Sequence, residues 1–156
     1  MADSDVTVRE AQPQEFRLIA QFVWEMARET EGLELDPETV EAAVQTALSD
    51  PDKGVYYVAE ADEGLIGQAL VTREWSDWNC CEYWWLQSIY VVPQWRRRGV
   101  FSSIYRHIRD RAHDASAAAL RLYVLESNMP AVAAYRRLGM TDTGYIVMED
   151  RCASRE

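Results

Sequence analysis

The chain has few residues that could bind a metal or form disulfides. Its 156 residues include three cysteines and two histidines. Cys80 and Cys81 are adjacent and Cys152 is far from both, which gives neither a disulfide framework nor the spacing of a metal site. His107 and His113 are six residues apart and do not share a helical face. We therefore expect reduced thiols and no metal site.

The sequence also lacks a long apolar run. No stretch approaches the roughly 20 apolar residues that cross a bilayer. The first ten residues, MADSDVTVRE, are too polar and acidic for a secretory signal. Linkers, internal repeats and low-complexity tracts are absent as well. With 48% hydrophobic and 27% charged residues, the composition is typical of a globular protein. We expect one domain over residues 1–156, located in the cytoplasm and without a membrane partner.

Basic residues are scarce in the first part of the chain. Residues 1–95 hold 19 acidic and 5 basic side chains, a net charge of −14, whereas residues 96–156 hold 7 and 11, a net charge of +4. The total of −10 argues against nucleic acid as a partner, because phosphate backbones need a basic surface. The acidic part either attracts a cationic amine or only keeps the protein soluble, and both interpretations stay open.

The first 50 residues predict a short strand and two helices. Val6 and its neighbours suit a strand, and apolar residues recur at helical spacing over residues 12–30. Gly32 is a natural end for this helix. Asp36 and Pro37 suit the N-cap and the first position of a second helix.

The next segment predicts a hairpin. Residues 55–60 and 65–72 are rich in aromatic and β-branched side chains and are joined by the short turn ADEG. A connection this short implies antiparallel pairing. We predict that residues 73–81, which contain two tryptophans, form a loop that either walls a ligand pocket or covers the core.

Residues 82–92 predict a central strand, because both of its alternating faces are largely apolar. A loop with Arg96, Arg97, Arg98 and Gly99 follows, and then a helical period. Backbone amides and the dipole at a helix start favour anions, arginines add charge-assisted hydrogen bonds, and glycine permits close approach. The arrangement suits a phosphate-bearing ligand, although a solvated basic loop that caps a helix has the same pattern.

The remaining elements complete an α/β domain with a mixed sheet. Residues 119–125 predict a fifth strand, parallel to the fourth because a helix connects them. Ser127 or Asn128 caps a further helix that ends at Gly139. Residues 141–149 predict a last strand.

Two motifs, together with the order of strands and helices around them, resemble those of the GNAT superfamily of acetyl-CoA-dependent N-acetyltransferases. The first is Arg96-x-x-Gly99 between a strand and a helix, and the second is Asn128-x-x-Ala-x-x-Ala-Tyr135-x-x-x-Gly139. The matching core covers about residues 82–140. Phe101 departs from the family pattern, which has glycine or alanine at that position.

The resemblance implies a mostly antiparallel sheet in which a parallel pair, the fourth and fifth strands, splays apart and is flanked by helices. Acetyl-CoA is the implied cosubstrate, with its pantetheine arm paired to the fourth strand and its pyrophosphate on the loop and first helical turn. The implied cofactor-binding residues are Ile89, Tyr90, Val91, Arg96, Arg97, Arg98, Gly99, Val100, Phe101, Ser102, Asn128 and Tyr135. Asn128 also fits a helix cap.

The implied reaction is direct attack of an amine on the thioester. By resemblance Tyr135 protonates the departing thiolate, although core packing is the ordinary role of a tyrosine on an apolar helix face. Glu82 and Glu126 are the candidate general bases, and Glu74 and Asp77 are weaker candidates. The ordinary interpretation of Glu82 and of Glu126 is a surface carboxylate.

The acceptor is expected to be a small-molecule or peptide amine. The aromatic segment before the fourth strand faintly resembles polyamine acetyltransferases, but Gln87 and Ser88 stand where those enzymes have acidic residues. Two other hypotheses stay open: an acyl-CoA-binding module without catalysis, and an unrelated α/β interaction domain. Family members are often dimers, so a homodimer is also expected.

Overall fold

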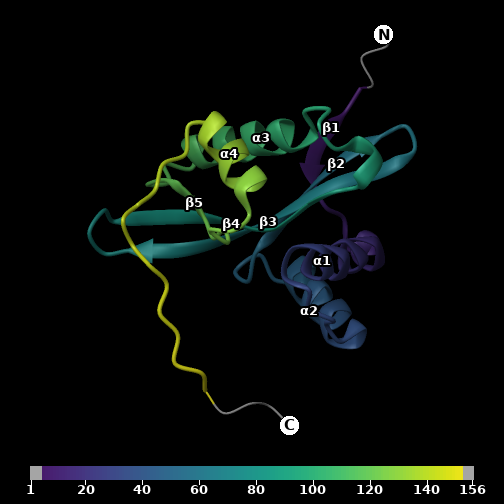
Figure 1. The fold of residues 1–156 in the computed structure, drawn as a ribbon, viewed down its shortest axis with the longest axis horizontal. Helices are drawn as coiled ribbons and strands as arrows, with labels where there is room; N and C mark the ends of the chain where they lie inside the picture. Colours follow the sequence, from purple (N-terminus) through teal and green to yellow (C-terminus); the bar gives the residue numbers. More distant parts are fainter. Residues whose placement is uncertain (1–4, 153–156) are drawn as a thin grey trace. The chain divides into compact units, whose positions relative to one another are not determined.

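A computed structural model describes residues 5–152, which form two compact parts divided after Tyr123 (Figure 1). The first part contains β1 (Thr7–Glu10), α1 (Phe16–Glu31), α2 (Pro37–Ser49), β2 (Val55–Ala61), β3 (Gly64–Ser76), β4 (Cys81–Val91), α3 (Val100–Asp114) and β5 (Leu120–Leu122), with short 3-10 turns at Pro13–Glu15 and Pro93–Trp95. The second part contains α4 (Met129–Arg137).

One five-stranded sheet runs through the first part in the order β1-β2-β3-β4-β5. The three pairs from β1 to β4 are antiparallel, and β4 pairs with β5 in parallel over Trp84–Leu86 and Leu120–Leu122. The predicted mixed sheet with one parallel pair is confirmed. The parallel pair follows from α3, which crosses between the two strands.

Local signals determine the first two helices. Gly32 adopts the left-handed conformation, with φ of +63°, and ends α1 as its C-cap. Asp36 caps α2, since its carboxylate accepts the backbone N–H of Thr39 at 3.0 Å. Pro37 occupies the first turn, where its missing N–H costs no intrahelical bond.

The helices cover both faces of the sheet, with α1 and α2 on one face and α3 on the other (Figure 1). Ile19, Val44 and Val58 form the core beneath α1 and α2 and are almost fully buried. On the other face, a Cβ added to Gly67 would lie 3.3 Å from side-chain atoms of Ile104 and Val100. Glycine therefore allows the N-terminal half of α3 to pack directly on β3.

The predicted loop over residues 73–81 is wrong. β3 continues to Ser76 and β4 begins at Cys81, so that Trp75 pairs with Glu82 across a hairpin whose turn is only four residues long. Cross-strand pairing stabilises this extension, which local propensity did not show. Trp75 and Trp78 are mostly exposed.

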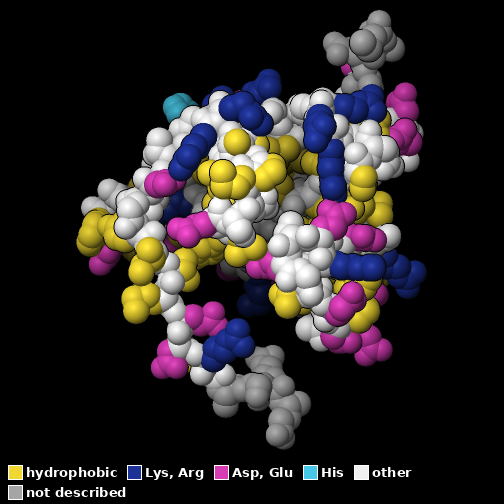
Figure 2. Space-filling model, viewed as in Figure 1, with side chains coloured by type: hydrophobic (Ala, Val, Ile, Leu, Met, Phe, Trp, Pro, Cys, Tyr) yellow, Lys and Arg dark blue, Asp and Glu magenta, His cyan; other side chains and the backbone are white. Residues whose placement is uncertain are grey.

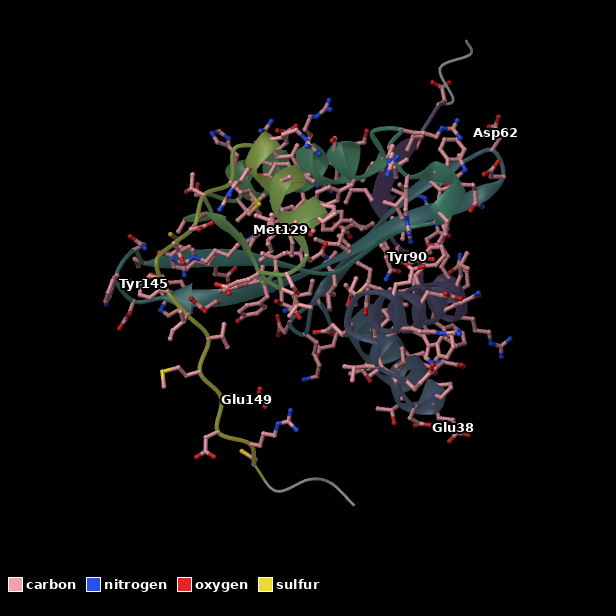
Figure 3. All side chains as sticks on the ribbon, viewed as in Figure 1. Glu38, Asp62, Tyr90, Met129, Tyr145 and Glu149 are labelled. Atoms are coloured by element: carbon pink, nitrogen blue, oxygen red, sulfur yellow. The ribbon has the colours of Figure 1, made fainter. Side chains whose placement is uncertain are left out.

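The predicted last strand is wrong as well. Residues 141–150 form no regular secondary structure, and Tyr145 (Figure 3) is exposed in that segment, as is Met148. β5 is shorter than predicted, with three residues in place of residues 119–125. A strand requires a partner for its backbone hydrogen bonds, and an apolar run alone does not supply one.

Acidic side chains gather over α1 and α2, with a few basic ones among them (Figure 2). Within residues 5–152, no helix combines the length and the apolar composition that a membrane span requires.

A histidine of α3 points toward the sheet. The ring of His107 meets that of Tyr57 edge-on, with centroids 5.6 Å apart, and its Nε2 is buried without a hydrogen-bond partner among the described residues. Burial lowers the pKa of His107, and the nearby Arg111 guanidinium lowers it further. The neutral imidazole is therefore the form that the fold favours.

This histidine should make stability depend on pH. Below about pH 6.5 the unfolded chain binds a proton at His107 that the folded chain does not yet bind, so the free energy of unfolding falls as the pH falls. Urea titrations between pH 7 and pH 5 should show this loss in the wild type and a smaller loss in His107→Phe. His113→Gln, a change at a 91% exposed side chain, is the control and should leave the slope unchanged.

Candidate functional site

A β-bulge interrupts β4 near its C-terminal end. Gln68 of β3 pairs with Tyr90, and Leu70 pairs with Gln87, so one residue of β3 faces two residues of β4, Ser88 and Ile89. Ser88 has a φ of +48°, in the left-handed region that favours glycine. A bulge bends its strand and changes the direction of the following backbone groups.

A buried glutamine side chain contacts this bulge. Gln68 is 0% exposed, and its Nε2 donates a hydrogen bond to the backbone carbonyl of Ser88 at 3.3 Å. Its Oε1 is buried without a partner in the part of the chain that the structure describes. The bond holds the carbonyl of a residue whose backbone is strained, so Gln68 stabilises the bulged conformation.

The outer edge of β4 is open beyond the bulge. Pairing with β5 ends at Leu86, and within residues 5–152 no strand pairs with that edge from Gln87 onward. The N–H of Val92 bonds to Ile66 of β3 at 2.9 Å. Because successive backbone groups alternate between the two edges of a strand, those of Val91 and Ile89 face the open edge. An extended ligand can pair there as an added strand.

The cationic loop, made of Arg96, Arg97, Arg98 and Gly99, follows β4 after the 3-10 turn at Pro93–Trp95. Arg97 and Gly99 have φ values of +61° and +80°, and α3 begins at Val100. Ser103 donates its N–H to the carbonyl of Gly99 at 3.0 Å. The amides before Ser103 form the N-terminal turn of α3, where the positive end of the helix dipole lies. The predicted loop and helix start are confirmed as structural elements, and they stand next to the open edge.

Arg96 connects this loop to β4 and α1. Its Nε donates to the carbonyl of Val91 at 2.8 Å, and its Nη2 lies 2.7 Å from the Glu29 carboxylate. Its guanidinium carbon also lies 5.4 Å from the ring centroid of Tyr90, which packs against Phe22 between the sheet and α1 (Figure 3). Arg96 therefore holds the end of β4, in addition to its predicted contact with phosphate.

The other two arginines differ in their surroundings. The guanidinium of Arg98 stacks on Trp95, 3.8 Å from the ring centroid, and the indole N–H of Trp95 donates to Glu63. Arg97 is exposed, as are Arg96 and Arg98.

The structure separates Glu82 from the bulge. Glu82 lies at the start of β4, seven residues before Ile89 or roughly 20 Å of strand. It pairs with Arg73 at 3.5 Å and alternates to the same face as Leu86, which is the face covered by α3. This position does not suit direct proton abstraction at the open edge.

Glu74 lies on the opposite face of the same hairpin. It pairs in register with Tyr83, and its Oε2 is 3.9 Å from Nη1 of Arg121 on β5. Asp77 lies in the hairpin turn, between β3 and β4. Neither carboxylate is close to the bulge along its strand.

The second part of the chain carries the other predicted residues. Asn128 caps α4, since its Oδ1 accepts the N–H of Ala131 at 3.4 Å, which confirms its predicted capping role. Burial raises the pKa of the Tyr135 phenol, so the phenol keeps its proton at neutral pH. Glu126 is exposed in the segment before α4.

Gln68 and Arg121 were not predicted from the sequence as residues of the site. Each is a single polar residue inside an apolar strand, in LIGQALV and in ALRLYVL. A polar side chain inside an apolar strand needs a hydrogen-bonding partner when it is buried. An isolated polar residue in an apolar run was therefore the sequence signal that could have identified both residues. Among the described residues, no group of His, Cys, Asp or Glu side chains is arranged to hold a metal ion.

Comparison with known proteins agrees with this geometry. Residues 16–140 match the model of the acetyltransferase (GNAT) family, across both parts of the chain. Streptothricin acetyltransferase of Streptomyces lavendulae is 35% identical over 95 residues, which are 61% of this chain and 48% of the relative. Thialysine N-epsilon-acetyltransferase of Bos taurus is 33% identical over 78 residues, 50% of this chain and 45% of the relative. The chain thus aligns with about half the length of these curated relatives.

One solved structure matches nearly the whole chain. A possible acetyltransferase from Clostridium difficile 630 is 34% identical and superposes with a TM-score of 0.90, covering 96% of this chain and 99% of its own.

Proposed function

The chain belongs to the acetyltransferase (GNAT) family, and from this membership we propose that it transfers the acetyl group of acetyl-CoA to a primary amine of a small molecule or peptide. The observation that carries the proposal is the open edge of β4 beyond the bulge, next to the cationic loop and the start of α3. Residues 1–156 act in this proposal as one catalytic domain.

The open edge and the loop suit the two ends of acetyl-CoA. The amides of a pantetheine arm can pair with the outward-facing backbone groups of Ile89 and with the N–H of Val91, whose carbonyl already accepts a hydrogen bond from Arg96. The pyrophosphate can bind the amides of the first turn of α3, where Gly99 has no Cβ to hold it away. Arg97 and Arg98 add positive charge at the same loop.

The chain's own groups account for the chemistry as follows. The amine forms a bond to the thioester carbonyl carbon, and the carbonyl oxygen gains negative charge that the Ile89 N–H can stabilise. The C–S bond then breaks, and Tyr135 donates its phenolic proton to the sulfur. The raised pKa of Tyr135 keeps that proton available. Glu126 is proposed to act through water as the base, with Glu82 and Glu74 less suited because each lies far from the bulge along its strand.

Thiol release from acetyl-CoA tests this proposal. The enzyme is mixed with polyamines, amino acids, aminoglycosides, and peptides that have free amines, and the released thiol is measured with a chromogenic disulfide. Amine-dependent release above the no-enzyme control is expected. Saturable binding of coenzyme A with no release for any amine would favour the non-catalytic acyl-CoA-binding module. Absence of coenzyme A binding by calorimetry would favour an interaction domain.

The contact between Gln68 and Ser88 gives a further prediction. Gln68→Leu removes the hydrogen bond that holds the bulge and should raise the KM for acetyl-CoA about tenfold. Ser88→Gly should partly restore the KM in the Gln68→Leu background, because glycine adopts a positive φ without strain. Gln87→Leu, which breaks a side-chain bond from β4 to Thr72 of β3, is the control and should leave this KM within about twofold. Equal effects of the two single variants would contradict a specific role for Gln68.

A further inference from the structure

The β3–β4 hairpin extends beyond α1 and α2 (Figure 1). An aromatic surface lies on this part of the sheet. Tyr83 and Trp85 of β4 share a face, and Trp85 stacks on Tyr123, with ring centroids 4.5 Å apart and planes at 24°. Tyr123 is 60% exposed. This face continues the one on which α1 packs, because Leu70 pairs with Gln87 and belongs to the core beneath α1.

Arg121 stands in this aromatic surface. It pairs in register with Trp85, and its guanidinium carbon lies 3.6 Å from the ring centroid of Tyr83 and 6.0 Å from that of Trp85. Its side chain is 23% exposed. Stacking on aromatic rings holds the guanidinium plane in a defined orientation.

The guanidinium N–H groups of Arg121 have few nearby acceptors among the described residues. Among the described residues its charged partner is Glu74, at 3.9 Å, which is beyond hydrogen-bond distance. A guanidinium carries five N–H donors, and a largely buried one without hydrogen bonds is costly. This side chain is thus oriented and partly desolvated, and within residues 5–152 its fork has no bidentate partner.

We propose that Arg121 binds a carboxylate of the acceptor, so that the amine acetylated by this enzyme belongs to an extended molecule with a carboxylate at its far end. The inference rests on the proposed function. A carboxylate matches the guanidinium fork with two parallel hydrogen bonds, which a phenol or an amine cannot form.

The register gives the approximate length of the acceptor. Trp85, opposite Arg121, precedes Ile89 by four residues, or roughly 13 Å of strand. A carboxylate at Arg121 therefore lies well away from an amine that reacts at the open edge near Ile89. Acceptors with an amine and a carboxylate separated by a flexible chain fit this span better than α-amino groups.

A series of ω-amino acids tests the proposal. The wild type is assayed by thiol release with 6-aminohexanoate, 8-aminooctanoate and 11-aminoundecanoate. Each is compared with the monoamine and the α,ω-diamine of the same length. At the best length, kcat/KM for the amino acid should exceed that for the diamine by at least about tenfold, as expected for one charged hydrogen-bonded pair.

Two variants should change this preference in opposite directions. Arg121→Gln should remove it, by lowering kcat/KM for the amino acid about 10- to 100-fold with little change for the monoamine. Glu74→Gln removes the competing carboxylate and should lower the KM for the amino acid. Arg109→Gln is the matched control, since Arg109 also lies over an aromatic ring, that of Tyr105 on α3, at 5.9 Å.

The two possible failures are distinguishable. If the wild type acetylates none of these amines and none of the broader amine panel, the proposed function fails. If it acetylates monoamines but shows no preference for the carboxylate, or if Arg121→Gln keeps the preference, the transferase stands and the assignment of Arg121 is overturned.

Discussion

Replacing Tyr135 by phenylalanine is expected to lower kcat for amine acetylation about a hundredfold and to leave the Kd for acetyl-CoA unchanged. The substitution removes one oxygen and its proton and keeps the aromatic ring. Because the pKa of this phenol is raised, its proton is present throughout the neutral range and is available when the thiolate departs. A loss confined to kcat is therefore the expected signature of a general acid.

Steady-state kinetics with a fast-reacting amine measures kcat. Calorimetric titration of coenzyme A measures the Kd separately. Tyr145→Phe is the matched control, since Tyr145 is 71% exposed and lies in the irregular segment after α4. An unchanged kcat in Tyr135→Phe, with chemistry shown to be rate-limiting, would remove Tyr135 from the mechanism. A weakened Kd with normal kcat would assign it to cofactor binding instead.

Replacing Ile104 by alanine is expected to lower the free energy of unfolding by about 2–5 kcal/mol. Ile104 is 0% exposed in α3 and reaches the position where a Cβ on Gly67 would lie. Removing its side chain leaves a cavity between α3 and β3, in a region where the backbone of β3 has no side chain that could fill it. The start of α3 would lose its direct packing against the sheet.

Urea titration and thermal melting followed by circular dichroism measure this loss, and the melting temperature should fall by about 5–15 °C. Leu33→Ala changes a leucine that is 50% exposed, and this control variant should lose far less. A loss below about 1 kcal/mol in Ile104→Ala would mean that the α3–β3 contact collapses around the smaller side chain.

Features with local causes were predictable from the sequence. The ends of α1 and α2 follow from Gly32, Asp36 and Pro37, whose backbone preferences and side-chain caps act within one helical turn. The loop before α3 was likewise predictable, from Gly99 and the three arginines that precede it. The family itself was identified from two motifs, and its model matches residues 16–140.

The length of the strands was not predictable in the same way. Residues 73–76 carry charged and aromatic side chains that favour a loop, yet they belong to β3 because β4 lies opposite them. Residues 141–149 contain the apolar run YIVM, which suits a strand, yet they form none in the structure. In both cases the decisive quantity is a hydrogen-bonding partner on another segment, and propensity does not contain it.

The sequence by itself therefore determined the family, the order of the main elements and the cationic turn, because caps, turns and motifs depend on neighbouring residues. Only the tertiary structure placed Gln68 against the strained carbonyl of Ser88 and Arg121 against the ring of Tyr83. The residues of these pairs are 20 and 38 positions apart in the sequence. Register across the sheet decides such contacts, because a shift by one residue would turn these side chains to the opposite face.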